Sequence, residues 1–390
     1  MPDIELDHIT KTFDSGRVVA VDDVSLTIRD GEFVFLLGPS GCGKTTTLRI
    51  ISGLEKPDRG VVRFDGRDVA NLPPWERGIG FVFQHFEIFP HMSVWENAVY
   101  GLEVRGFSHE VIVERGEKAL SMVGLLPYAD DSPMKFGNPG LQRLGLARAI
   151  ATGARVLVMD EPLGSLDPKV RLNFRLELRR LVKSLGLTAL QVTHDQDEAL
   201  AVGDRIVVMR KGKLLQTDTP ERVYKEPNSI FVANFMGEMN FLQGFVFPPG
   251  VASSGDDGQV IVQLRTGGPR LRVSLRGVHE AFRVDERVVA TVRYEDVHVF
   301  PPQFDFDRPE NARVRRLLNL FDAEVVSQRF VGTSTRFILR LQNGDEVNAI
   351  ERRRYKHEFA PRDVATLGIH PNDVKLFRQP TNLERELSLQ

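Results

Sequence analysis

The apolar residues of the first half of the chain fall into short continuous runs. Such runs lie within 33–37, 155–161 and 188–195, and each is bounded by polar or glycine residues. Runs of this length between turn residues are typical of parallel strands that are buried on both faces. Residues 4–29 alternate apolar and polar positions instead, which indicates antiparallel strands that lead into the buried sheet.

Between these runs the spacing of apolar residues becomes helical. Residues 94–129, and those that follow Gly137, carry apolar side chains three or four positions apart, which is the period of a helix with one buried face. Pro139 suits the first turn of the second helical stretch. Strands that alternate with helices predict an α/β domain over residues 1–238, with a helical subdomain at about 90–152.

A further helix is predicted to begin at Asp167 and Pro168, which suit an N-cap and a first turn. Its apolar positions include Phe174 and Leu178, which we expect to be buried. Three basic residues occupy the other positions, and we interpret them as a solvated face: Arg171, Arg175 and Arg179.

The character of the chain changes after residue 238. Helical spacing fades, and short alternating strands follow, separated by glycine, proline and aspartate. The segments 292–300 (VRYEDVHVF) and 369–377 (IHPNDVKLF) also resemble each other position by position. Alternation together with an internal repeat predicts a β-rich domain at 239–390 that contains two related units.

Composition narrows the classes of function. The formal net charge is −2, so there is no basic excess of the kind that nucleic-acid binding requires, and we expect no nucleic-acid partner. No run approaches about 18 apolar residues, so no membrane-spanning helix is predicted. The acidic start, MPDIE, lacks the features of a signal peptide. A single cysteine excludes an internal disulfide, and together these features predict a cytosolic protein that can still lie against a membrane.

A glycine-rich segment follows the first buried run. Residues 38–46 read GPSGCGKTT and fit the phosphate-binding pattern G-x-x-x-x-G-K-[ST] between a strand and a helix. Backbone N–H groups in such a loop, and the N-terminus of the next helix, attract phosphate oxygens. We expect Lys44 to reach the outer phosphates and Thr45 to ligate Mg²⁺. The residues predicted to contact nucleotide here are Gly38, Pro39, Ser40, Gly41, Cys42, Gly43, Lys44, Thr45 and Thr46.

Polar residues end three other predicted strands. They are Gln84, the pair Asp160 and Glu161, and His194. In α/β sheets ligands bind at the carboxyl ends of the strands, so we expect these side chains near the phosphates. Asp160 and Gln84 are candidate Mg²⁺ ligands. Glu161 is a candidate to polarise the attacking water, and His194 a candidate contact of the γ-phosphate.

In their order these motifs resemble those of ATP-binding cassette (ABC) ATPases over roughly the first 240 residues. The resemblance implies a P-loop NTPase fold, ATP as the nucleotide and Mg²⁺ as its metal. It also implies that Gln84 is the Q-loop glutamine and His194 the switch histidine. Asp160 and Glu161 match the Walker B pair, of which the second is the catalytic carboxylate.

Two further positions acquire a role from this resemblance. Phe13 ends the first predicted strand beside a polar turn, where its ring either stacks on an adenine or packs locally. It falls where the family has its adenine-stacking aromatic residue, which favours the first interpretation. Residues 164–167 resemble the D-loop, which implies that Asp167 contacts a second ATPase subunit.

The β-rich domain resembles the regulatory, oligonucleotide-binding (OB)-like extension of importer ATPases for sugars, polyamines, iron and sulfate. Within that group, 80–86 and 235–244 are most similar to sulfate/thiosulfate importers. The resemblance implies an energy-coupling subunit at the cytoplasmic face of the membrane. Its implied partners are a second ATPase subunit, integral-membrane permeases and, indirectly, a solute-binding protein. Sulfate or thiosulfate is the expected solute, with iron, polyamine or sugar as the alternative.

The chain departs from the family in the signature loop, which contacts the γ-phosphate held by the opposite subunit. Aligned on Gln142, Gly137 stands at the family's serine. Pro139 stands at its second glycine, and Gly140 at its first glutamine. Gly137 has no hydroxyl and Pro139 has no N–H to donate. Losing one or two bonds of roughly 1.5–3 kcal/mol predicts hydrolysis slowed by roughly ten- to a thousandfold, unless Asn138 supplies a replacement donor.

Three functions follow from these observations. The expected one is a hydrolysing importer subunit that forms a homodimer. The alternative is a weakly hydrolysing regulatory subunit, paired with another ATPase in a heterodimer so that one composite site keeps an intact signature. A soluble ABC protein that acts on DNA or the ribosome is disfavoured, because the chain has neither sustained heptads nor a basic charge.

Overall fold

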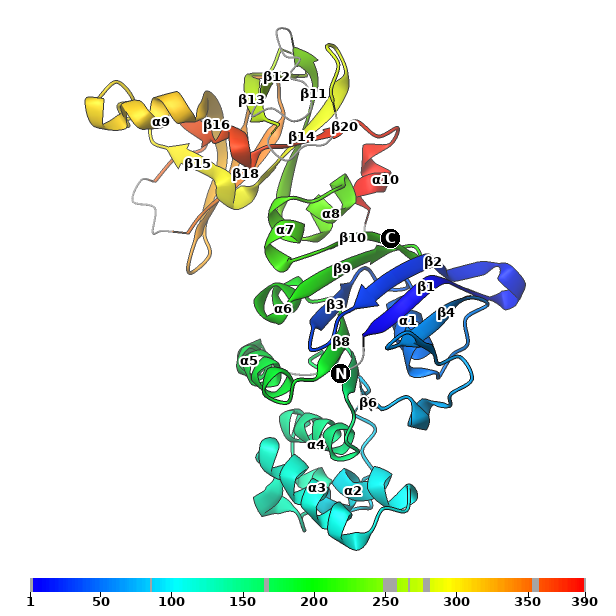
Figure 1. The fold of residues 1–390 in the computed structure, drawn as a ribbon. Coiled ribbons are helices and arrows are strands. Elements are labelled where there is room, and N and C mark those ends of the chain that lie inside the picture. The colour runs from blue at the N-terminus through cyan, green and yellow to red at the C-terminus, as the bar shows by residue number, and fades with distance from the viewer. Residues whose placement is uncertain are drawn as a thin grey trace. The chain divides into compact units, whose positions relative to one another are not determined.

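The structure is a computed structural model of the chain (Figure 1). It describes residues 3–84, 86–164, 168–247, 258–265, 267–275, 281–352 and 358–388, without the side chains of 168–170. Contacts divide the chain into two units between Lys225 and Glu226. The segment 226–238, which we expected in the first domain, therefore packs with the second unit.

The first unit is built on a six-stranded sheet of order β10-β9-β3-β8-β7-β6. β10 is antiparallel to β9, and every other neighbouring pair is parallel. All five side chains of β3 are fully buried, as the continuous apolar run predicts. The strands are β3 (Phe33–Leu37), β6 (Ile79–Val82), β7 (Val156–Asp160), β8 (Thr188–Thr193), β9 (Arg205–Arg210) and β10 (Lys213–Asp218).

A second, antiparallel sheet of order β2-β1-β4-β5 belongs to the same unit. It contains β1 (Ile4–Phe13), β2 (Val18–Ile28), β4 (Arg59–Phe64) and β5 (Arg67–Asp68). The alternating residues 4–29 thus form the predicted antiparallel pair. Helix α1 (Lys44–Ser52) buries Leu48, Ile50 and Ile51 in one hydrophobic cluster with residues of both sheets. The helix that follows the glycine loop is therefore anchored on two sides.

The other helices of this unit lie around the parallel sheet. Figure 1 shows α5 and α6 on the face opposite α1, and α2, α3 and α4 together beyond β6. This group of three is the predicted helical subdomain. Its first helix begins with a complete capping box, in which Ser93 and Glu96 each bond the other's backbone N–H. The helices are α2 (Val94–Val104), α3 (His109–Met122), α4 (Asn138–Ala151), α5 (Pro168–Ser184), α6 (Gln196–Val202) and α7 (Pro220–Lys225).

Arg171, Arg175 and Arg179 on α5 all form ion pairs, so the prediction of a solvated basic face is wrong. Arg171 and Arg175 both bond the carboxylate of Asp195, and Arg179 bonds Asp204 at 2.9 Å. Arg175 is only 8% exposed. The two carboxylates come from segments distant in sequence, which is why the helix period alone gave the wrong result.

The second unit contains two five-stranded sheets, of order β13-β12-β11-β14-β20 and β15-β19-β16-β17-β18. Its helices are α8 (Ile230–Phe235), α9 (Ala312–Leu317) and α10 (Leu383–Leu387). Its strands are β11 (Met239–Phe247), β12 (Gln259–Leu264), β13 (Arg270–Ser274), β14 (Arg287–Arg293), β15 (Val297–Phe300), β16 (Asn319–Phe330), β17 (Thr335–Arg340), β18 (Glu346–Glu351), β19 (Val364–Ile369) and β20 (Lys375–Arg378).

The two segments that repeat in sequence pair with each other. Each forms a strand, one short 3-10 turn and a second strand, as β14–β15 and β19–β20. β14 pairs with β20 in one sheet, and β15 pairs with β19 in the other. Each repeat thus contributes its last strand to the sheet of the other. One hydrophobic core consequently contains residues of both sheets.

Two buried asparagines tie the sheets together in the same symmetric way. Asn240 on β11 bonds both backbone groups of Asn348, at 2.7 and 2.9 Å. Asn319 on β16 bonds both backbone groups of Arg272, at 2.8 and 2.9 Å. Asn348 and Arg272 lie on the edge strands β18 and β13. Each side-chain amide therefore satisfies backbone groups that the edge of a sheet would leave unpaired.

Candidate nucleotide-binding and catalytic site

Four adjacent parallel strands end at the predicted site residues. β3 leads into the glycine loop, β8 into His194, β7 ends at Asp160, and β6 leads to Gln84. They are neighbours in the order β3-β8-β7-β6, so their carboxyl ends lie at the same edge of the sheet (Figure 1). Strand order, and not sequence proximity, brings the motifs together.

Two glycines let the loop pack against its neighbours. A Cβ at Gly43 would lie 2.0 Å from the Ala20 carbonyl oxygen, and the residue has φ +105°. A Cβ at Gly38 would lie 2.2 Å from the Met209 carbonyl oxygen. Any other residue therefore displaces the loop from β2 or β9. At the tip, Ser40 and Gly41 are exposed.

Lys44 and Cys42 lie beneath the loop. The Lys44 ammonium donates to the carbonyls of Gly38 and Pro39, at 2.8 and 2.9 Å. Its side chain is buried and lies directly after the loop, as a phosphate contact requires. Cys42 is 4% exposed, and burial raises the pKa of its thiol while Lys44 opposes the rise. Cys42 is therefore a packing residue of the loop.

The Glu161 carboxylate lies between two other predicted site residues. Gln84 Nε2 donates to one carboxylate oxygen at 3.2 Å, and His194 Nδ1 lies 3.2 Å from the other. Glu161 also has φ +44°, and its N–H donates to the Val192 carbonyl of β8 at 3.0 Å. A non-glycine residue with positive φ needs such support. The side chain is thus aimed by contacts on both sides.

Two of the three residues predicted to hold Mg²⁺, Thr45 and Asp160, meet in the structure and have donor atoms that fit that ion, whereas the Gln84 amide bonds Glu161. Thr45 Oγ1 donates to Asp160 Oδ1 at 3.3 Å, so hydroxyl and carboxylate oxygens of the expected type meet at the loop. Burial raises the pKa of Asp160, and the hydrogen bond from Thr45 opposes the rise. In the described parts of the chain no group of three His, Cys, Asp or Glu side chains is placed to hold a metal. Mg²⁺ needs only one or two carboxylates when a nucleotide supplies phosphate oxygens.

Phe13 lines an open hollow at the end of β1. The hollow, also lined by Thr12, Asp14 and Asp58, has a volume of about 770 Å³. Its ring is 38% exposed, and the Lys11 ammonium lies 5.3 Å from the ring centre. Phe13 is thus partly exposed beside a cation, and its stacking on an adenine stays a prediction.

The signature segment begins helix α4. Gly137 is the N-cap residue in extended conformation, without a side-chain cap. The N–H groups of Gly140 and Leu141 both bond the Gly137 carbonyl, and Pro139 has no N–H. Few backbone donors therefore remain here for a phosphate. Asn138 is the first residue of the helix. Asp167 lies outside the described residues.

Sequence reasoning missed the part that Gln142 plays. Its amide is 2% exposed and donates to the Pro162 carbonyl at 2.7 Å. Pro162 directly follows Glu161, so this bond connects helix α4 to the segment that follows β7 and carries Glu161. The sequence offered one signal for this contact, a glutamine at a position on the buried side of the predicted helix.

Sequence reasoning also missed the buried carboxylic acid Glu198, which lies four residues after His194 in the chain. Glu198 is 2% exposed and accepts bonds from Gln191 at 2.6 Å and from Thr193 at 2.8 Å. Thr193 in turn accepts from the N–H of Asp195. Burial raises the pKa of Glu198 to about 7, against the bonds from Thr193 and Gln191 and the charge of Arg175. The acid thus supports the loop that presents His194.

A glycine loop, paired acids and a strand-end histidine on one parallel sheet, with a helical insertion, define a P-loop nucleotide-binding cassette. The model of the ABC transporter family matches residues 21–164, and the TOBE domain model matches 308–377. Relatives whose names describe them as import ATP-binding proteins are 37–43% identical to the chain and cover most of it. The chain belongs to the import ATP-binding proteins of ABC transporters, and it is an ABC-type ATPase that binds ATP.

Relatives cover most of the chain. The spermidine/putrescine import ATP-binding protein PotA of Acetivibrio thermocellus is 41% identical over 77% of this chain and 80% of its own length. PotA of Marinobacter nauticus is 37% identical over 89% of this chain and 87% of its own. The Fe(3+) ions import ATP-binding protein FbpC of Agrobacterium fabrum is 43% identical over 68% of this chain and 75% of its own length.

Solved structures resemble the first unit. The dimeric, post-hydrolysis ATP-binding cassette MJ0796 with ADP and Pi is 32% identical and covers 56% of this chain and 98% of its own, with a TM-score of 0.50. CbiO1 of Clostridium perfringens, part of the cbiONQ transporter complex, is 25% identical and covers 57% of this chain and 90% of its own, with a TM-score of 0.54. Within the described part of the chain no helix is long and apolar enough to span a membrane.

The relatives do not support sulfate as the solute. Those most similar name polyamine or ferric-ion import, so 80–86 and 235–244 were poor guides to the solute. The physical reason is that an ATPase subunit contacts nucleotide and permease, whereas the solute meets other chains. These findings favour the alternative solutes over the expected one.

Glu198→Gln is predicted to change the pH dependence of stability. The raised pKa means that the folded state holds a proton which the unfolded state releases between about pH 4.5 and 7, so wild-type stability falls with rising pH in that window. Glutamine cannot ionise, so at about pH 8 the variant is expected to be more stable by roughly 3 kcal/mol, and equal near pH 4.5. Gln191 Oε1 has no partner among the described residues, so its amide can turn to accept the new N–H.

The measurement is thermal unfolding of the full chain at both pH values. Glu117→Gln, on the exposed side of α3, is the matched control and should show no such window. A Glu198→Gln difference that is independent of pH would contradict the assignment of this titration to Glu198.

Proposed function

We propose that this chain is the energy-coupling subunit of an ABC importer for a polyamine or for ferric ion. The observation that carries the catalytic part is the Glu161 carboxylate held between Gln84 and His194, at 3.2 Å from each. The solute class rests on the names of the relatives that cover most of the chain. By the same reasoning the partners are a second ATPase subunit, membrane permeases and a solute-binding protein, at the cytoplasmic face of the membrane.

The chemistry is an in-line attack of water on the γ-phosphate of ATP. Glu161 orients the water and accepts its proton, and His194 contacts the γ-phosphate. Lys44 leaves the carbonyls of Gly38 and Pro39 to neutralise phosphate charge. Thr45, Asp160 and Gln84 would hold Mg²⁺, whose charge would offset that of the phosphates. Phe13 stacks on the adenine. Each role remains a proposal for these residues.

The altered signature favours a second candidate, a regulatory subunit that hydrolyses ATP weakly. Pro139 provides no N–H, and those of Gly140 and Leu141 are bonded to Gly137. In a homodimer both composite sites would have this defect; in a heterodimer with an intact partner only one would. The supported carboxylate argues for hydrolysis, because a subunit that only binds ATP has no need of an aimed base.

Glu161→Gln is predicted to abolish turnover while ATP binding remains. Glutamine keeps the size of the side chain and one acceptor oxygen but cannot accept the proton, so kcat should fall at least a hundredfold. The bound ATP should then hold two chains together, which size-exclusion chromatography detects as an ATP-dependent dimer. Turnover near the wild-type rate would contradict the role of Glu161.

The same variant tests the solute in cells of the source organism. Uptake of labelled spermidine and of labelled ferric ion is measured with wild type and with Glu161→Gln as the only copy. Loss of one uptake identifies the solute. If both persist while the purified variant is inactive, the solute proposal is wrong and the ATPase proposal stands.

The double substitution Gly137→Ser/Pro139→Gly is predicted to raise turnover by about tenfold or more, because it restores a hydroxyl and an N–H donor. A Cβ at Gly137 meets only Pro139 Cδ, at 3.7 Å, so serine fits without strain. Steady-state hydrolysis by the purified chain is the measurement. Lys118→Gln, at an exposed position of α3, is the control. An unchanged rate would show that another donor, such as Asn138, already replaces the signature.

A further inference from the structure

The His194 ring has little to hold it besides its own backbone. Its side chain is 61% exposed, and among the described residues its nitrogens have one partner, the Glu161 carboxylate, 3.2 Å from Nδ1. An exposed side chain with a single contact is free to change rotamer. The place of the ring beside Glu161 therefore depends on how firmly the residues on either side of His194 are fixed.

Those two residues belong to a closed ring of hydrogen bonds. Thr193 Oγ1 accepts from the Asp195 N–H at 3.0 Å and donates to Glu198 Oε2 at 2.8 Å. The Glu198 N–H donates to Asp195 Oδ1 at 3.0 Å, which makes Asp195 the N-cap of α6. Thr193 and Glu198 are both buried. The backbone on either side of His194 is therefore fixed to the end of β8 and to the start of α6.

The second carboxylate oxygen of Asp195 joins this ring to α5. Arg171 and Arg175 both bond Asp195 Oδ2, the first at 3.1 Å. The side chains of Arg171, Arg175 and Asp195 are only 24%, 9% and 19% exposed. Removing one partner of such a pair leaves a largely buried charge, which costs much more than breaking an exposed pair. The two arginines therefore hold Asp195 firmly.

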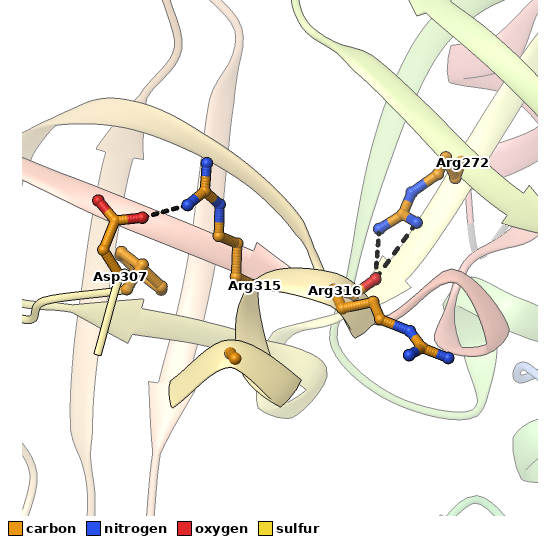
Figure 2. A pocket seen from close by; sticks show the side chains of 6 residues that line it. Arg272, Asp307, Arg315 and Arg316 are labelled. Atoms are coloured by element: carbon orange, nitrogen blue, oxygen red, sulfur yellow. Dashed lines mark hydrogen bonds and ion pairs between the residues drawn. The ribbon is translucent and has the colours of Figure 1, made fainter. Parts of the chain in front are cut away.

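The convergence of two arginines on one carboxylate depends on their spacing. Arg171 and Arg175 are four residues apart, so they lie on the same face of α5. Arg315 and Arg316 of α9 are adjacent in sequence, and Figure 2 shows Arg315 directed at Asp307 and Arg316 directed away from it. Basic residues on a helix thus share a partner only where the helical period aligns them, as it does at Asp195.

These contacts close a circuit through the catalytic carboxylate. The chain runs from Glu161 into α5, which begins at Pro168. Ion pairs lead from α5 to Asp195, and the ring of His194 leads back to Glu161. Asp195 is the point at which α5 meets the segment that carries the histidine. Loss of its charge would open the circuit there.

We propose that Asp195 is a positioning residue for His194, and that Arg171 and Arg175 act through it. Asp195 fixes the backbone from which His194 reaches the γ-phosphate beside Glu161. This inference rests on the role in hydrolysis proposed above for His194. Loss of the Asp195 charge should slow the chemical step and leave ATP affinity unchanged, because the glycine loop is not altered.

The test is a double-mutant cycle on steady-state ATP hydrolysis by the full chain. Asp195→Asn keeps an oxygen that can accept from the Glu198 N–H and loses the charge that pairs with the arginines. It should lower kcat about tenfold and change KM for ATP less than about twofold. With His194→Ala already present, the same substitution should change kcat less than about twofold, because no ring is left to position.

Asp204→Asn is the matched control. Asp204 also pairs with two cations of α5, Arg179 and Lys183, and it accepts from the Phe33 N–H at 2.8 Å, but it precedes β9 and not α6. The control should lower the melting temperature, as Asp195→Asn does, and leave kcat unchanged with or without His194. A fall in kcat that only follows lost stability would appear in this control as well.

Arg171→Gln is a second, milder variant, which leaves Arg175 on Asp195 and keeps the test valid if Asp195→Asn does not fold. It should lower kcat severalfold, and only when His194 is present. Equal losses with and without His194 would overturn the positioning role. So would full activity of Asp195→Asn when His194→Ala is slow, and in both cases the proposed function would stand. Unchanged turnover in His194→Ala would instead contradict the role proposed for His194, and this inference with it.

Discussion

The site depends on one geometric constraint, the adjacency of β3, β8, β7 and β6 at one edge of a parallel sheet. At its carboxyl end each strand leads to predicted site residues, which for β3 are those of the glycine loop. The Glu161 carboxylate completes the arrangement, because it contacts residues that follow the strands on either side of its own. Its positive φ and its N–H bond to β8 show that the backbone as well as the side chain is fixed. Preorganised groups of this kind stabilise developing charge without reorganisation.

Much of this arrangement follows from the sequence. The glycine loop, Gln84, Asp160, Glu161 and His194 were predictable because apolar runs mark buried strands and strand ends mark the site. Local pattern could also place the helical subdomain.

Other features could not be predicted, because they depend on contacts between distant segments. The carboxylates that pair with the arginines of α5 come from the segment after β8 and from the loop before β9. The buried role of Glu198 is similar: its spacing from Asp195 suggests a helix start, whereas its side chain bonds Gln191 and Thr193. The relatives name polyamine and ferric-ion import and do not name sulfate, so the segments 80–86 and 235–244 gave no reliable signal of the solute.

The β-rich unit illustrates the same distinction. The repeat at 292–300 and 369–377 was visible in the sequence, but the exchange of last strands was not. Nor were the amides of Asn240 and Asn319, which tie each sheet to the edge strand of the other. The two joints differ in their edge residue, which is Asn348 in one and Arg272 in the other.

The most direct test of the central claim is a double-mutant cycle on kcat for ATP hydrolysis, with Gln84→Ala, His194→Ala and both together. If the two residues position one carboxylate, each single change should cost about tenfold or more, and the double variant little more than the worse single. Costs that simply multiply would mean that Gln84 and His194 act independently, and would contradict the account of Glu161 as a group held by both.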